Sequence, residues 1–141
     1  MSITLAPIAD SPRLAVAEAF AGDDEIAHIL QMVADRDALI ARGVVIRSDT
    51  TGTSCELPVD GDPVLEALRR RIHEAVGFEN DLGHTMRFRR YVPGEWHPLH
   101  VDNYTIGDRV LVATAILYLT DCEAGGETHF PSARPEPLLI A

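Results

Sequence analysis

A chain of 141 residues, 46% of them hydrophobic, is long enough to form one packed domain and too apolar to be disordered throughout. Its formal net charge of −10 argues against nucleic-acid binding, which needs clustered Lys and Arg. No apolar run approaches the roughly 20 residues that span a bilayer, and no secretory leader is expected at the start of the chain.

The two cysteines, Cys55 and Cys122, are too few for a secreted disulfide scaffold, and their spacing fits no zinc motif. We therefore expect reduced thiols and a cytoplasmic location. The densest basic runs, at 69–71 and 87–90, lie in segments with regular-structure patterns, so solvated faces are the simple interpretation.

The N-terminal part is expected to be an irregular lead-in followed by a helix. Pro7 and Pro12 oppose a long helix in residues 1–21. Apolar residues then recur at helical spacing and predict one amphipathic helix over residues 24–41, ended by Gly43.

A second helix is predicted farther along the chain. Residues 44–46 are a strand candidate, and residues 48–54, rich in Thr, Ser and Gly, are expected to be a loop. The helix should begin at Pro63, behind the capping residue Asp62, and end at Gly77.

After this helix the pattern changes to strands. The run 109–119 is almost continuously apolar, which predicts a long strand buried on both faces, and 103–108 is a polar loop. Helices followed by consecutive strands indicate an α+β fold in which helices support a β sandwich or small barrel. The expected strands are residues 85–92, 96–101, 109–119, 127–130 and 138–140.

The pair His100-x-Asp102 carries the most chemical information. In a strand, residues two apart point to the same side, so an imidazole and a carboxylate at this spacing can reach one metal ion. Two histidines and one carboxylate on one face of the metal leave coordination positions open, as non-haem Fe(II) oxygenases require. The pair alone is a common chance occurrence, so its setting decides its meaning.

That setting resembles the prolyl-4-hydroxylase group of 2-oxoglutarate dioxygenases. The resemblance covers residues 22–141, including the helical segments 24–33 and 62–77. It rests on three ordered motifs: YVPGEWHPLHVDN from Tyr91 to Asn103, TAILYLTD from Thr114 to Asp121, and GGETHFP from Gly125 to Pro131.

The resemblance implies an α+β fold in which N-terminal helices pack on a double-stranded β-helix, or jelly-roll, core that is incomplete at the C-terminus. Residues 1–21 would be the lead-in and 22–141 a partial dioxygenase domain, with helical support over 22–84 and strands over 85–141.

The resemblance also implies the chemistry. His100 and Asp102 would bind Fe(II), while Tyr91, Tyr118 and Thr114 would line the pocket of the cosubstrate 2-oxoglutarate. The reaction would couple decarboxylation of 2-oxoglutarate to succinate with hydroxylation of a small-molecule or peptidyl substrate, and ascorbate is a candidate further ligand. Neither a nucleic acid nor a membrane is an expected partner.

Simpler interpretations of several of these residues stay open. Tyr91 and Tyr118 could be core or edge tyrosines, and Thr114 could bond its strand neighbours. His97 stands where relatives often carry an aromatic residue; it could assist cosubstrate binding, but exposure beside Pro98 is the simpler expectation. Packing is likewise the expectation for Trp96.

The sequence departs from the family pattern at its end. A second histidine ligand and a basic anchor for 2-oxoglutarate are expected after Phe130, and neither is present. The chain could be a piece of a longer product, be completed by a second chain, or be a degenerate relative. His129 or His84 replacing the ligand is a further alternative. A non-catalytic binding or assembly module on the same fold is therefore the rival function, followed by a cupin-like small-molecule binder.

Overall fold

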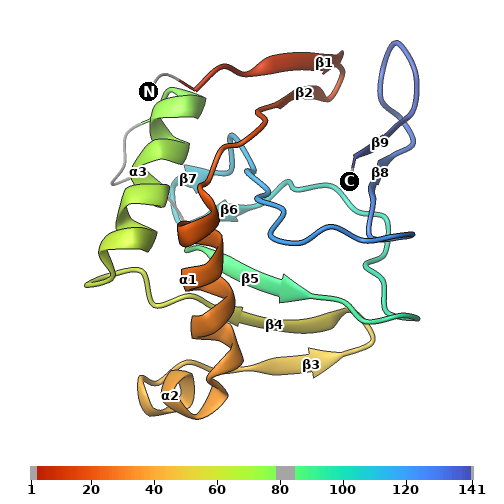
Figure 1. Cartoon of the computed structure of the whole chain (residues 1–141). Coiled ribbons are helices and arrows are strands. Elements are labelled where there is room, and N and C mark those ends of the chain that lie inside the picture. The colour runs from red at the N-terminus through yellow and green to blue at the C-terminus, as the bar shows by residue number, and fades with distance from the viewer. Residues whose placement is uncertain (1–2, 79–84, 141) are drawn as a thin grey trace. The chain divides into compact units, whose positions relative to one another are not determined.

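The computed structural model describes residues 3–78 and 85–140 (Figure 1). By their internal contacts they form two compact units. Unit 1 combines the N-terminal segment up to Ile26 with the C-terminal segment from Leu117, and unit 2 runs from Ala27 to Ile116. Each unit is described by itself.

Unit 1 contains two short antiparallel pairs of strands. Strand β1 (Ala6–Asp10) pairs with β2 (Arg13–Val16), and β8 (Thr128–Phe130) pairs with β9 (Leu138–Ile140). The two strands expected at 127–130 and 138–140 are thereby confirmed. A backbone bridge joins Ser11 and Arg134, in which the Arg134 N–H donates to the Ser11 oxygen over 2.9 Å.

The irregular lead-in predicted for residues 1–21 is wrong for residues 6–16, which form the β1–β2 hairpin. Proline opposes a helix but does not oppose this hairpin. A two-stranded sheet has only edge strands, where a residue without an N–H is tolerated, and Pro7 lies in such a strand. Pro12 lies between the two strands, where no ladder bond is needed.

Two helices replace the single one predicted over residues 24–41. Helix α1 spans Asp23–Ala34 and α2 spans Arg36–Ala41. The break falls at Asp35, whose carboxylate accepts a hydrogen bond from the Ala38 N–H over 3.0 Å and so caps a new helix. Asp favours such capping positions because its side chain competes with the helical backbone for N–H groups.

Helix α3 (Pro63–Val76) confirms the second helix prediction in both of its ends. Asp62 caps the N-terminus, Pro63 occupies the first turn, and Gly77 ends the helix in the left-handed conformation with φ +79°. Leu65 and Leu68 on its apolar stripe are completely buried. The burial of these two side chains fixes α3 in the core of unit 2.

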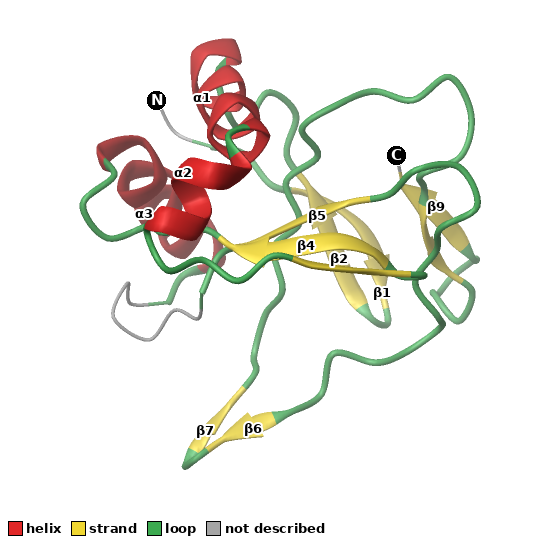
Figure 2. Ribbon diagram, turned by 90° about the horizontal axis from the view of Figure 1, so that it is seen from below, coloured by secondary structure: helices red, strands yellow, loops and turns green. Residues whose placement is uncertain are grey.

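The central sheet of unit 2 has the order β3–β4–β5 and is antiparallel throughout. Its strands are β3 (Arg47–Asp49), β4 (Gly52–Glu56) and β5 (Arg87–Arg90), the last within the predicted strand 85–92. In Figures 1 and 2 the three helices gather toward the end of the sheet at which β3 and β5 begin.

Two predictions for residues 44–54 are wrong. Residues 44–46 are not a strand, and the expected loop 48–54 is largely the β3–β4 hairpin. Thr and Ser suit strands when partners exist, and here both β3 and β5 supply hydrogen bonds to β4. The resulting pairing buries Cys55 of β4, where it faces Phe88 of β5.

The region from 96 to 119 differs most from expectation. The strand predicted at 96–101 is absent, and the one predicted at 109–119 is reduced to β7 (Arg109–Val110). The loop predicted at 103–108 contains β6 (Thr105–Ile106), which pairs with β7 in a hairpin that projects from the β3–β4–β5 sheet on long loops (Figure 2). A strand needs a neighbouring strand for its N–H and C=O groups. The Leu111 N–H still donates to the Tyr104 oxygen over 3.0 Å, but no described strand pairs with residues 112–116.

The burial predicted for that apolar run is also wrong. Val110, Val112 and Ile116 are more than half exposed. The described part of the chain is therefore a mixed α/β structure with four small antiparallel sheets, and it contains no closed barrel, so the jelly-roll expectation is not confirmed. Within residues 3–78 and 85–140, no helix combines the length and apolarity needed to cross a membrane.

Candidate metal centre

His100 and Asp102 come together in unit 2, although not in the way that the sequence predicts. They lie in a segment without regular structure, so strand alternation does not place them. Their side chains nevertheless converge, with Nε2 of His100 only 3.1 Å from Oδ1 of Asp102. About half of each side chain is exposed, which leaves the pair accessible to a ligand from solvent.

The orientation of the His100 ring is set by its other nitrogen. Nδ1 lies 2.8 Å from the Pro98 carbonyl oxygen, which can only accept, so the ring donates its Nδ1–H there. In a neutral His100 this tautomer leaves the lone pair on Nε2, the nitrogen that lies 3.1 Å from the Asp102 carboxylate oxygen. A histidine that ligates a metal is commonly held in this way, by a backbone carbonyl on its second nitrogen.

The pair fits a divalent cation. A lone pair and an anionic oxygen 3.1 Å apart attract each other only if a positive charge, a proton or a metal ion, lies between them. Two donors bound side by side at about 2.1 Å from one metal lie about 3 Å apart, which matches this separation. Imidazole and carboxylate are also the donors that non-haem Fe(II) sites use.

Within the described residues, no three side chains of His, Cys, Asp or Glu already form a metal-binding group. His100 and Asp102 are thus a two-donor site in this arrangement. Their assignment as iron ligands stays a prediction.

The segment that carries the pair is anchored to the central sheet. The Trp96 N–H donates to the Thr50 oxygen over 3.2 Å, at the turn between β3 and β4. Nη1 of Arg89, on β5, donates to the Thr51 oxygen of the same turn over 2.9 Å. The β3–β4 turn, which is held by Arg89 of β5, thereby fixes the position at which the 97–102 loop begins.

Asp49 at the end of β3 adds negative charge beside this loop. Its pKa is lowered, first by the side-chain and backbone hydrogen bonds from Thr51 and to a lesser extent by the charges of Arg89 and His97, while burial opposes the shift. The Asp49 carboxylate is therefore ionised at neutral pH.

Of the three residues predicted to line a cosubstrate pocket, Tyr91 and Thr114 belong to unit 2 and Tyr118 to unit 1. Tyr91, 42% exposed, lies with its ring centre 6.0 Å from the Arg89 guanidinium carbon, and Thr114 is exposed outside regular structure. Tyr118 belongs to unit 1, where its hydroxyl is 2.6 Å from Oγ1 of Thr128 and donates to the Ile140 oxygen over 3.3 Å. Their role in a pocket stays a prediction.

The other histidines named in the sequence analysis do not share the surroundings of His100. His97 is exposed beside Pro98, as expected, but its ring also contacts that of His100. His129 is exposed on β8 in unit 1. His84 lies outside the described residues.

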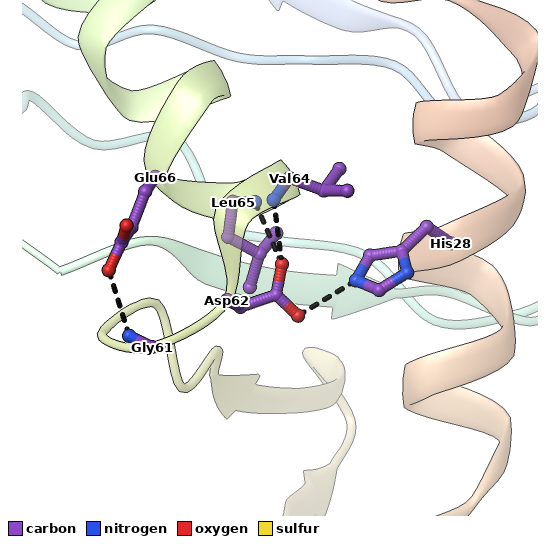
Figure 3. A network of polar contacts seen from close by, with 6 residues as sticks. All are labelled: His28, Gly61, Asp62, Val64, Leu65 and Glu66. Atoms are coloured by element: carbon purple, nitrogen blue, oxygen red, sulfur yellow. Dashed lines mark hydrogen bonds and ion pairs between the residues drawn. The ribbon is translucent and has the colours of Figure 1, made fainter.

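Sequence reasoning missed a second polar cluster, built around the Asp62 cap (Figure 3). Nε2 of His28, on α1, lies 2.8 Å from Oδ2 of Asp62, while Oδ1 accepts from the N–H groups of Val64 and Leu65. Burial raises the pKa of Asp62, but the hydrogen bonds from Leu65, His28 and Val64 outweigh it and leave the pKa below its usual value. The capping signal was readable, whereas a partner 34 residues away was not.

Comparisons with known proteins agree with the sequence motifs. The chain is similar to plant prolyl 4-hydroxylases. Prolyl 4-hydroxylase 1 of Arabidopsis thaliana is 28% identical over 138 residues, which cover 87% of this chain and 48% of the relative. Prolyl 4-hydroxylase 5 of the same plant is 26% identical over 138 residues, 87% of this chain and 46% of the relative.

A third Arabidopsis thaliana relative, probable prolyl 4-hydroxylase 11, is 30% identical over 73 residues, 52% of this chain and 25% of the relative. The chain thus spans less than half the length of each of these relatives. No family model matches the chain, and no solved structure matches it. The similarity therefore establishes a distant relationship to prolyl 4-hydroxylases.

Proposed function

We propose that this chain is part of an Fe(II)- and 2-oxoglutarate-dependent oxygenase, a hydroxylase of the prolyl-4-hydroxylase type, in which His100 and Asp102 are iron ligands. The observation that carries the proposal is the 3.1 Å approach of Nε2 of His100 to Oδ1 of Asp102, with the ring oriented by Pro98. The similarity to plant proteins named prolyl 4-hydroxylases supports it.

The residues of the site have separable roles in this proposal. His100 would offer Nε2 as the nitrogen donor, because its Nδ1–H is committed to the Pro98 carbonyl. Asp102 offers an anionic oxygen and neutralises part of the charge of the cation. When bound, iron would supply the oxygen chemistry that couples conversion of 2-oxoglutarate and O₂ into succinate and CO₂ with hydroxylation of a substrate.

The wider assignments form part of the same proposal. Tyr91, Thr114 and Tyr118 would contribute to binding 2-oxoglutarate, because hydroxyl groups can donate to its carboxylates. The names of the relatives favour a peptidyl proline as substrate, with a small molecule as the alternative. The proposal also includes ascorbate as a further ligand, a second chain as a partner that completes the domain, and a cytoplasmic location.

Succinate formation tests the proposal. The purified chain is incubated with Fe(II), 2-oxoglutarate and O₂, and succinate is quantified with and without iron. His100→Ala and Asp102→Ala should each reduce iron-dependent turnover by at least about 100-fold, because an open site loses one of its few ligands. His129→Ala is the matched control, and far-UV circular dichroism should be the same for all three variants. Unchanged turnover in both ligand variants would show that the metal lies elsewhere.

A non-catalytic binding or assembly module is the second candidate. It is favoured by the finding that no three potential ligands are gathered among the described residues. It predicts that the chain forms no succinate and retains no iron after anaerobic loading and desalting. Retained iron together with succinate formation would exclude this candidate.

A further inference from the structure

Residues 110–116 of unit 2 have the composition of a paired strand but lack the pair. The large side chains of this segment are more than half exposed: Val110 65%, Val112 62% and Ile116 57%. No backbone hydrogen bond joins residues 112–116 to the part of the chain that the structure describes. β-Branched residues favour strands, and a strand needs a neighbour for its N–H and C=O groups.

We propose that residues 112–116 are a dimerisation strand, which pairs antiparallel with the same residues of a second copy of this chain across a two-fold axis. The inference specifies the second chain of the proposed function and rests on that proposal for this role alone, because no metal ligand takes part in the pairing. Exposed strand edges of this kind are the usual sites at which chains add strands to one another.

The sequence of the segment is nearly symmetric about Thr114. Positions at equal distances from it carry the same kind of side chain: Ala113 and Ala115, Val112 and Ile116, Leu111 and Leu117. An antiparallel pair centred on Thr114 places Val112 of one copy opposite Ile116 of the other and the two threonines opposite each other. Thr–Thr pairs stabilise antiparallel strands, and β-branched side chains pack well across them. Residues 110–120 contain no charge, so the pairing opposes no like charges, and a second copy is the partner that the segment fits.

The β6–β7 hairpin, which projects from the β3–β4–β5 sheet in Figure 2, leaves the required edge free. The Leu111 N–H donates to the Tyr104 oxygen over 3.0 Å, so the backbone groups of odd-numbered residues point toward β6. Backbone groups alternate in direction along a strand, and those of even-numbered residues point away from β6. Continued along the segment, this alternation brings three residues to the free edge: Val112, Thr114 and Ile116. These are the residues that exchange hydrogen bonds in a pair bonded at Thr114.

The chain exposes enough surface for such an interface. Its accessible surface is 10520 Å². By the scaling of folded monomers, two separate compact units of the sizes of unit 1 and unit 2 would together expose only about 8,600 Å². The excess, about 1,900 Å², is larger than the roughly 800 Å² that each partner buries in a standard interface. The area is therefore sufficient for a stable dimer.

Sedimentation velocity of the complete purified chain tests the pairing, at about 0.15 M salt to screen the repulsion between copies of net charge −10. The wild type should sediment as a dimer with twice the chain mass of 15.4 kDa. Val112→Glu/Ile116→Glu places glutamates opposite each other at both symmetric positions, so it should raise the dimer Kd at least about 100-fold. Ile40→Glu/Val45→Glu is the matched control, because it adds the same charges at two other exposed apolar positions and should change the Kd less than about threefold.

Charge-swapped variants determine the register. Val112→Lys/Ile116→Glu places the lysine of each copy opposite the glutamate of the other only in the antiparallel pairing, since a parallel pairing would oppose like charges. It should dimerise at least about 10-fold more tightly than Val112→Glu/Ile116→Glu. Val112→Lys/Ile116→Lys lowers the net charge of the chain but opposes lysines, so it should dimerise as weakly as the double-glutamate variant. Far-UV circular dichroism should be the same for all variants, because both positions are exposed.

This inference and the proposed function fail in different ways. A wild type that stays monomeric up to about 1 mM, a Kd that Val112→Glu/Ile116→Glu leaves unchanged, or a charge-swapped variant no tighter than the double-glutamate one would overturn the dimerisation strand. Succinate formation by the wild type would still support the oxygenase in each of these cases. A dimer with the expected register that forms no succinate with iron would overturn the proposed function and leave the pairing in place.

Discussion

Replacing Asp62 should destabilise unit 2 through two separate contacts. Its Oδ1 accepts from the N–H groups of Val64 and Leu65 at 3.1 and 3.0 Å, and its Oδ2 accepts from His28 at 2.8 Å. The Asp62 side chain is only 10% exposed, so water cannot readily replace the lost acceptor. In Asp62→Ala, the first turn of α3 keeps two donors without a partner, and α1 loses its polar contact with the cap.

The size of the effect follows from these contacts. Loss of an N-cap side chain costs about 0.5–2 kcal/mol. The His28 contact adds about 0.5 kcal/mol rather than a full buried hydrogen bond, because that side chain is 38% exposed. We expect a total loss of about 2 kcal/mol in the free energy of unfolding. With a urea dependence of about 2 kcal/mol per M, the midpoint should fall by about 1 M.

Urea denaturation followed by far-UV circular dichroism measures this loss. Asp62→Asn is the matched control, because Asn caps helices about as well as Asp and should lose less than about 1 kcal/mol. His28→Ala, combined with Asp62→Ala in a double-mutant cycle, separates the contact between α1 and α3 from the capping contribution. An Asp62→Ala loss below about 0.5 kcal/mol, the range of ordinary surface changes, would refute the reasoning.

The same residue gives a pH dependence with a defined sign. The pKa of Asp62 is lower in the folded chain than the ordinary value of 3.8. Its contribution to stability is therefore fully present above about pH 4 and is lost as the pH falls through the folded-state pKa. The stability difference between the wild type and Asp62→Asn should be constant near neutral pH and decrease below about pH 4. A difference that grows on acidification would contradict this assignment.

Three further results are expected from other parts of the chain. Gly52→Ala should lower the free energy of unfolding by about 1–3 kcal/mol in urea denaturation, because Gly52 has φ +91° and an added Cβ would overlap the backbone of β5. The control Gly61→Ala, at φ +86° in open space, should lower it by less. Equal losses in the two variants would argue against the overlap. Leu68→Ala should cost about 2–5 kcal/mol, because that side chain is completely buried, and a loss under about 1 kcal/mol would show that it is not part of the core. Iodoacetamide should label Cys122 well before Cys55 at pH 8, because Cys55 is buried and burial raises its pKa. Equal labelling rates of the two thiols, measured by mass spectrometry, would contradict the burial of Cys55.

Locally encoded features could be predicted from the sequence. The limits of α3 follow from a cap, a proline and a glycine, each of which acts on its own few neighbours. The centre of β5 and the strands β8 and β9 also agree with local patterns. The motif around His100 and Asp102 was readable as well, since ligand spacing along a chain does not depend on the surrounding fold.

Features that depend on partners were not readable. The break between α1 and α2 was missed because Asp35 competes with an otherwise continuous helical pattern. Apolar residues alone did not make 109–119 a strand, because a strand also requires a neighbouring strand to bond.

The sequence by itself determined which groups are available near the candidate metal centre: two imidazoles and a carboxylate within residues 97–102. Only the tertiary structure decided how they are presented. The Pro98 carbonyl selects the nitrogen that carries the lone pair, and the Thr50 carbonyl holds the loop against the sheet. A hydrogen bond depends on distance and direction in space, so contacts such as that of His28 with Asp62 arise only once the chain has folded.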